Sequence, residues 1–132
     1  MAGLSGSDGP YLADACAVIA FVADAAMSKA MRTIMSDGDV CISPVTVWEI
    51  TRKASLGLLP KQWNDGGLAG HLQRLGFRPL PLVWIDAEQA NDLPPLHKDP
   101  MDRMLIAQAL RHDMCIITSD RIFAAYGVRT IW

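Results

Sequence analysis

Short apolar runs of strand length alternate with longer segments of helical periodicity from Tyr11 to the end of the chain. Residues 40–42 and 114–118 are the clearest runs, and residues 11–13 form a shorter one. The segments between them repeat apolar side chains three and four positions apart, which indicates helices with one buried face. This alternation predicts an α/β fold with a mainly parallel sheet.

Local signals divide the chain further. Ser43 and Pro44 favour a helix start, because Ser is a good N-cap and Pro suits the first helical position. Residues 78–84 contain Pro79 and Pro81, which predict an edge strand or a loop. We expect a last strand over 128–132 and helices over 15–35, 44–57, 68–75, 86–93, 99–112 and 121–126.

The length of 132 residues suits one domain, and 51% apolar with 20% charged residues is a globular composition. Residues 1–10 are rich in Gly and Ser and have no basic segment followed by an apolar run, so we expect a flexible tail rather than a signal peptide. The domain itself should then span residues 11–132. The net charge of -2 argues against a general nucleic-acid scaffold but not against a nuclease with an acidic active site.

Three cysteines lie in apolar runs, at Cys16, Cys41 and Cys115. An odd number without paired spacing is no disulfide framework, so we expect buried small hydrophobic side chains and a reducing compartment. No apolar run approaches the roughly 20 residues that a membrane helix needs. These features predict a cytoplasmic protein without a membrane segment.

Four acidic residues fall where an α/β sheet binds ligands. Asp14 follows the first strand, and Asp120 follows the strand over 114–118. Glu49 lies in the second turn of the helix after the second strand, and Asp102 lies in the first turn of the helix over 99–112. Ligands of open parallel sheets bind outside the carboxyl ends of the strands, so we expect the four carboxylates in one crevice.

Such a cluster requires a compensating charge. Two carboxylates about 4 Å apart repel each other by about 4 kcal/mol at an effective dielectric near 20. Protons or a divalent cation must offset this repulsion, and oxygen ligands suit Mg²⁺ or Mn²⁺. A metal-activated water at such a site can hydrolyse a phosphodiester.

Each acid also has an ordinary structural alternative. Asp14 and Asp120 could cap the helices that follow them. Glu49 could pair with Arg52 or Lys53 on its own helix.

The segment that opens with Asp99 and Pro100 is a helix-start signature. Asp99 is best explained as the N-cap, and Asp102 could complement the helix dipole rather than bind metal. Both alternatives remain open for Asp102.

The chain resembles the PIN-domain ribonuclease toxins of the VapC type over residues 11–132. Four segments carry the resemblance, and the third is the most specific: residues 12–17, 43–50, 97–109 and 117–120. The resemblance implies a three-layer α/β/α fold and an acidic quartet of Asp14, Glu49, Asp102 and Asp120. It also implies accessory roles for Asp99, Ser119 and Arg103.

The resemblance further implies an activity and partners. Proteins of this family are Mg²⁺- or Mn²⁺-dependent endoribonucleases, often acting on tRNA or ribosomal RNA. A VapB-type antitoxin holds them inactive, and they form homodimers or larger toxin–antitoxin assemblies.

The other conspicuous side chains have ordinary structural interpretations as well. The cations near the acids are solvated surface when taken singly, but together they could form a phosphate rim. The histidines show no metal-ligand spacing, and His97 is interpreted as a surface residue that could touch substrate. The tryptophans are assigned to core or interface packing. These residues are Arg52, Lys53, Lys98, Arg103 and Arg121; His71, His97 and His112; and Trp48, Trp63, Trp84 and Trp132.

Two rival functions remain at this stage. The first is a non-catalytic PIN-like module that binds RNA or a protein. The second is a nucleotide-binding α/β module, which needs a glycine-rich turn directly after a strand. Gly66, Gly67 and Gly70 lie far from the predicted strands, which speaks against the second.

Overall fold

The computed structural model describes residues 9–132, so most of the predicted tail lies outside the described residues. A five-stranded parallel sheet forms the centre, in the order β3-β2-β1-β4-β5. The predicted parallel sheet is therefore confirmed, although the last two strands are shorter than expected. The strands are β1 (Tyr11–Ala13), β2 (Val40–Ile42), β3 (Arg78–Pro79), β4 (Cys115–Ile117) and β5 (Thr130–Ile131).

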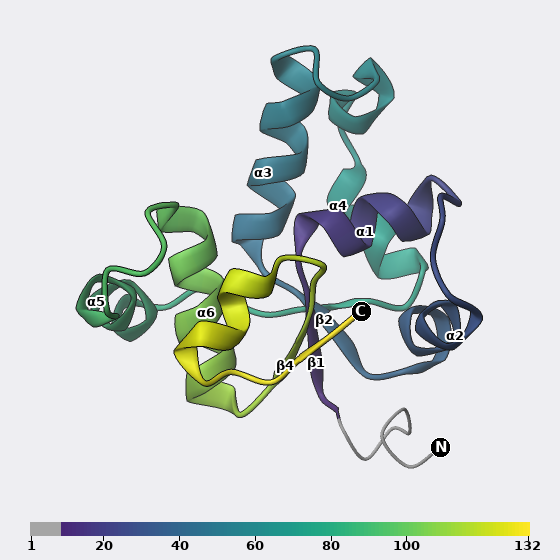
Figure 1. Cartoon of the computed structure of the whole chain (residues 1–132). Helices are drawn as coiled ribbons and strands as arrows, with labels where there is room; N and C mark the ends of the chain where they lie inside the picture. Colours follow the sequence, from purple (N-terminus) through teal and green to yellow (C-terminus); the bar gives the residue numbers. More distant parts are fainter. Residues whose placement is uncertain (1–8) are drawn as a thin grey trace.

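Helices cover both faces of the sheet and give three layers, with α1 and α2 on one side and α5 and α6 on the other (Figure 1). No helix within residues 9–132 has the length and apolarity that a bilayer crossing requires. The α-helices are α1 (Ala15–Val22), α2 (Lys29–Asp37), α3 (Pro44–Ser55), α4 (Leu68–Arg74), α5 (Trp84–Asp92) and α6 (Pro100–His112), and the 3₁₀ helices are η3 (Lys61–Asn64) and η4 (Arg121–Tyr126).

Successive side chains of a strand point to opposite faces of the sheet, so the core consists of two apolar clusters, one on each face. Tyr11 and Ala13 point to one apolar cluster, which α1, α2 and α4 complete. Leu12 points to the other cluster, which contains Leu105 and Ile106 of α6. All three residues of β1 are fully buried because β1 lies between β2 and β4 and under both helical layers.

The predicted helix over 15–35 is wrong, because the chain breaks it into α1 and α2. Asp24 adopts a left-handed backbone conformation with φ of 53°, which no α-helix continues through. Ser28 then caps α2 by accepting a hydrogen bond from the N–H of Met31 at 3.1 Å. The apolar spacing over residues 15–35 fits either one long helix or two shorter ones, and the cap at Ser28 favours two.

Helix α5 begins at Trp84 rather than at the predicted Asp86. The Asp86 side chain is fully buried, and it accepts hydrogen bonds from the Val83 N–H at 3.0 Å and from Arg111 of α6 at 2.6 Å. Burial alone would raise the pKa of Asp86, but the hydrogen bonds from Arg111 and Val83 outweigh it and lower that pKa. The ion pair therefore joins α5 to α6.

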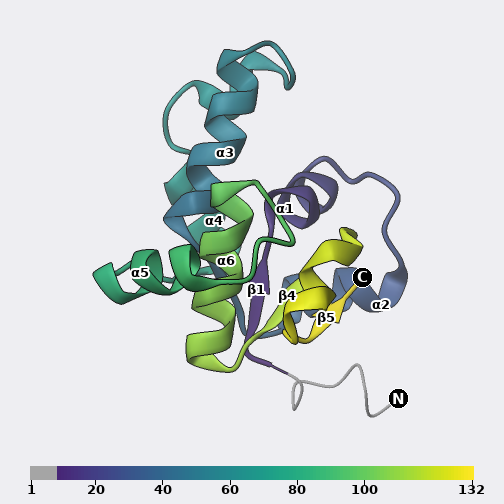
Figure 2. The same ribbon diagram turned by 60° about the vertical axis from the view of Figure 1, so that its left-hand side comes forward.

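The direction of strand addition reverses between β1 and β4. From β1 the sheet grows outward through β2 and β3, whereas β4 and β5 lie on the other side of β1. Asp14 directly follows β1, and Ser119 and Asp120 follow β4. Helix α3 starts at the end of β2 and extends away from the sheet in both views (Figures 1 and 2). A binding site is expected at this switch point.

Candidate active site

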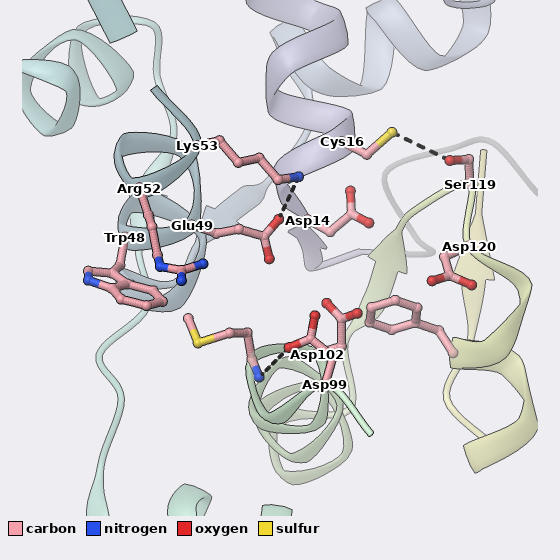
Figure 3. A pocket seen from close by; sticks show the side chains of 12 residues that line it. Asp14, Cys16, Trp48, Glu49, Arg52, Lys53, Asp99, Asp102, Ser119 and Asp120 are labelled. Atoms are coloured by element: carbon pink, nitrogen blue, oxygen red, sulfur yellow. Dashed lines mark hydrogen bonds and ion pairs between the residues drawn. The ribbon is translucent and has the colours of Figure 1, made fainter. Parts of the chain in front are cut away.

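A pocket of about 350 Å³ opens at the switch point. It lies between the starts of α1, α6 and η4 and the middle of α3. The carboxylates of Asp14, Glu49, Asp99, Asp102 and Asp120 line it, and Figure 3 shows them pointing toward one another across the pocket. The structure thus brings all four predicted acids to one place, together with Asp99. The lining residues are Asp14, Cys16, Trp48, Glu49, Arg52, Lys53, Asp99, Met101, Asp102, Ser119, Asp120 and Phe123.

Three of the acids are held by the helices that they cap. Asp14 caps α1, Asp99 caps α6 and Asp120 caps η4, each by accepting a backbone N–H two or three residues later. The donor–acceptor distances are 2.9, 2.9 and 3.1 Å. The capping alternative is therefore confirmed for these residues. A carboxylate has two oxygens, so a cap leaves the second oxygen available to the pocket.

Asp102 lies at the centre of the cluster. Its carboxylate belongs to two groups of potential metal-ligating atoms that lie within 4.8 Å of one another, one with Glu49 and Asp99 and one with His97 and Asp120. The carboxylate of Asp102 is mostly buried, with 17% of the side chain exposed. Asp102 is therefore the residue that the two groups have in common.

Asp14 and Glu49 flank this centre. Asp14 lines the pocket and is buried, but it belongs to neither of the two close groups found among residues 9–132. Glu49 forms the predicted ion pair with Lys53 at 3.3 Å while its carboxylate remains within the cluster. The ordinary pairing and a ligand role are therefore compatible at Glu49.

His97 contributes to the site, and sequence reasoning missed this. Its Nε2 lies 2.7 Å from Oδ2 of Asp102, and its Nδ1 accepts a long 3.5 Å hydrogen bond from the N–H of Asp99. An accepting Nδ1 places the proton on Nε2, so the imidazole donates to Asp102. The ring edge packs on Phe123 with centroids 6.3 Å apart. The expectation of a surface histidine does not hold.

Arg103 is a structural clamp rather than part of a phosphate rim. Its guanidinium points away from the pocket and binds the loop that carries His97. Tyr126 fastens the same loop by accepting the N–H of His97 at 2.8 Å and donating to Pro94 O at 2.8 Å. The guanidinium donates to the carbonyl oxygens of Asn91, Leu93, Pro94 and His97 and to the Tyr126 hydroxyl.

The remaining predicted residues divide between the pocket and the surface. Ser119 lines the pocket, with Oγ 3.4 Å from Sγ of Cys16. Cys16 is exposed there, contrary to the prediction that all three cysteines are buried. Arg52 and Lys53 line the pocket, whereas Lys98, Arg103 and Arg121 are not among its lining residues.

The core alternative does not hold for three of the four tryptophans, and interface packing stays a prediction for these three. Trp84 is 92% exposed, and Trp48 and Trp132 are about half exposed. Trp63 packs against the core cluster as predicted. Trp48 is the tryptophan that lines the acidic pocket.

Burial perturbs the acidity of two of the carboxylates, Asp102 and Asp14. Burial raises the pKa of Asp102 from 3.8 to about 6, with the nearby charges of Asp99 and Glu49 adding to the rise and His97 opposing it. Burial also raises the pKa of Asp14, against hydrogen bonds from Thr118 and the backbone. The charged forms of Asp102 and Asp14 are therefore disfavoured in the absence of a cation.

We predict that the raised pKa of Asp102 makes the unfolding free energy of the metal-free protein depend on pH. A raised pKa in the folded state means that Asp102 stabilises the metal-free fold below about pH 4, and that this contribution is lost as pH rises through about 6. The loss from Asp102 amounts to at most about 3 kcal/mol of unfolding free energy. Denaturant melts in EDTA across this range measure it. If the unfolding free energy of Asp102→Asn fell as steeply with rising pH as that of the parent protein, Asp102 would not be the group responsible.

The donor set fits a hard divalent cation. Carboxylate oxygens dominate the cluster, and Mg²⁺ and Mn²⁺ prefer oxygen ligands. His97 points its Nε2 at Asp102, and hydrogen bonds of this kind orient ligating carboxylates. The raised pKa of Asp102 is the second observation that supports the fit, because a cation would relieve it.

Fold and pocket together define an α/β protein with a carboxylate-lined pocket at the switch point of a parallel sheet. The family model of the PIN domain matches residues 11–128, and the chain belongs to the PIN domain family. A comparison with curated proteins finds no match.

Solved structures share this fold at low sequence identity. FitAcB from Neisseria gonorrhoeae has a TM-score of 0.70 and 20% identity over 93% of this chain and 97% of that one. VapBC from Salmonella typhimurium bound to DNA has a TM-score of 0.69 and 18% identity over 92% and 96%. VapBC2 from Rickettsia felis bound to a promoter DNA fragment has a TM-score of 0.68 and 13% identity over 92% and 98%.

Proposed function

We propose that the protein is a metal-dependent endoribonuclease that hydrolyses RNA phosphodiester bonds in its acidic pocket. The observation that carries the proposal is the convergence of carboxylates from α1, α3, α6 and η4 on one pocket, with Asp102 at their centre. A module that only bound RNA would have no use for such a cluster, because carboxylates repel phosphates.

Asp14, Glu49, Asp102 and Asp120 are the residues that would hold Mg²⁺ or Mn²⁺, directly or through water, with Asp99 beside them. When bound, such a cation lowers the pKa of water and offsets the negative charge that develops on the phosphate.

Two further side chains orient these acids: His97, which contacts Asp102, and Lys53, which lines the pocket. His97 fixes one oxygen of Asp102 at 2.7 Å, which leaves the second oxygen free to face the pocket. Lys53 holds Glu49 at 3.3 Å and reduces its repulsion from Asp102. Both contacts pre-organise the cluster before substrate arrives.

We further propose that the protein is the toxin of a VapC-type toxin–antitoxin pair. The family resemblance implies a VapB-type antitoxin, a tRNA or ribosomal RNA target and a homodimer that can enter larger assemblies. The similar structures include VapBC proteins from Rickettsia felis and Salmonella typhimurium, which supports this reading.

Cleavage of total RNA by purified, antitoxin-free protein tests the proposal. We expect discrete fragments in Mg²⁺ or Mn²⁺ and none in EDTA, because the carboxylates alone repel the phosphodiester. Discrete fragments distinguish specific endonucleolytic cuts from degradation by a contaminant. The result is read by gel or by sequencing of the new ends.

Two results of the same experiment would contradict the proposal. Folded protein that binds RNA in every metal but never cleaves it would contradict the nuclease proposal and favour the non-catalytic module. Cleavage that is unchanged in EDTA would contradict the metal requirement.

A further inference from the structure

Helix α3 presents an aromatic and a basic side chain to one edge of the pocket. Trp48 and Arg52 are one helical turn apart, and the Arg52 guanidinium carbon lies 5.4 Å from the centroid of the indole ring. Figure 3 shows both at the α3 edge, on the opposite side from Ser119 and Asp120. Glu49 lies between them in sequence and points toward the acids.

Packing within residues 9–132 does not account for the position of Trp48. The residues of α3 that are buried in the core are Val45, Thr46, Ile50 and Ala54, and Val47 packs against it. Trp48 is 53% exposed although it lines a pocket, so much of its apolar surface remains in contact with solvent. Because Arg52 lies over one face of the ring, the other face of this exposed indole is the flat surface on which a nucleobase can stack.

The charge of the pocket is asymmetric. Its lining within residues 9–132 includes five carboxylates, and its cations are Arg52 and Lys53, both on α3. Lys53 is paired with Glu49, whereas no carboxylate of the described chain lies within ion-pair distance of Arg52. A polyanion that approaches the acids is therefore attracted from the α3 edge, where a guanidinium can bind a phosphate through two N–H groups.

We propose that Trp48 and Arg52 form a subsite for a nucleotide that flanks the cleaved bond, with its base on the indole and its phosphate on the guanidinium. Stacking needs an unpaired base, so the subsite selects single-stranded RNA or a loop over a duplex. The inference rests on the proposed function, because it names the substrate class of the same pocket.

Binding of a fluorescein-labelled single-stranded RNA of about ten nucleotides tests the subsite. The Asp102→Asn background removes cleavage from the measurement. Trp48→Ala should weaken binding by about fivefold to hundredfold, because one stacked base is lost. Trp48→Phe should recover most of the affinity, since an aromatic face remains. Trp84→Ala is the matched control, because Trp84 is more exposed but lies outside the pocket.

The salt dependence of RNA binding measures the contribution of the Arg52 charge. Arg52→Ala should reduce the slope of log affinity against log salt by about 0.7, the value for one phosphate on a single strand. Arg74→Ala, which alters an exposed arginine outside the acidic pocket, should leave the slope unchanged. A 2-aminopurine base in the RNA should be quenched on binding by the parent protein and not by Trp48→Ala.

The outcomes separate the subsite from the nuclease activity. Metal-dependent cleavage with equal RNA affinity in Trp48→Ala and Trp84→Ala would overturn the subsite and leave the nuclease proposal standing. Trp48-dependent binding without cleavage in any divalent metal would support a stacking site for single-stranded RNA at this edge and would contradict the nuclease proposal and the place of the subsite beside a cleaved bond. A Trp48→Ala variant that binds RNA normally but loses its protein partner would overturn the subsite and assign this edge to that partner.

Discussion

Replacing Asp102 with Asn should lower the rate of RNA cleavage by more than about 100-fold, because loss of a contact to a ligating residue alone costs 10- to 100-fold. The variant should stay folded, since Asn is isosteric and its amide oxygen can still accept the hydrogen bond from His97. Without metal at neutral pH it should be at least as stable as the parent, because a disfavoured charge is removed. Single-turnover cleavage and denaturant melts measure the two effects.

Asp113→Asn is the matched control for this change. Asp113 follows the other end of the same helix, its side chain is 96% exposed, and Asn tolerates its left-handed backbone. We expect normal cleavage from it. Retained metal-dependent activity in Asp102→Asn would remove Asp102 from the mechanism, whatever the control shows.

Replacing Arg103 with Ala should lower the unfolding free energy by about 3 kcal/mol, because several hydrogen bonds from a charged donor are lost and two partly buried carbonyl oxygens, those of Leu93 and His97, lose their donor. Cleavage should fall as well, since the loop that carries His97 loses its clamp. Arg103→Lys should recover little, because an ammonium group cannot span the spaced carbonyl oxygens. Denaturant unfolding measures the stability change.

The same variant distinguishes a clamp from an RNA contact. An RNA-contacting arginine would weaken substrate binding and leave the unfolding free energy unchanged. The exposed Arg121 is the control, and Arg121→Ala should alter stability by no more than about 0.5 kcal/mol. If Arg103→Ala and Arg121→Ala had equal unfolding free energies, the role of Arg103 as a structural clamp would be contradicted.

The sheet was predictable because buried parallel strands have a plain sequence signature. The runs at β2 and β4 are short and apolar, and parallel pairing follows from the helices between them. The division of the first helical segment was not predictable from periodicity. Its apolar spacing suits one long helix, and the break depends on the left-handed Asp24 and the cap at Ser28.

Within the pocket, the acids follow local rules that sequence carries. Asp14 and Asp120 stand at strand ends, and Asp99 and Asp102 stand at a helix start, so topology alone brings them together. Asp14, Asp99 and Asp120 each cap a helix and also line the pocket, so the two roles are compatible.

His97 and Trp48 depend on information that local sequence does not carry. His97 reaches Asp102 because Arg103 and Tyr126 hold its loop, and Tyr126 is 29 residues away in the chain. Trp48 lies on the polar face of α3, and periodicity does not tell whether such a face meets solvent or a pocket.

Calorimetric titration of Mn²⁺ into metal-free protein near neutral pH tests the metal-dependent account most directly. The account predicts saturable binding to the parent protein, binding at least about tenfold weaker to Asp102→Asn, and RNA cleavage that rises over the same Mn²⁺ range. Equal Mn²⁺ affinity in the two proteins, or cleavage that develops without Mn²⁺ occupancy, would contradict it.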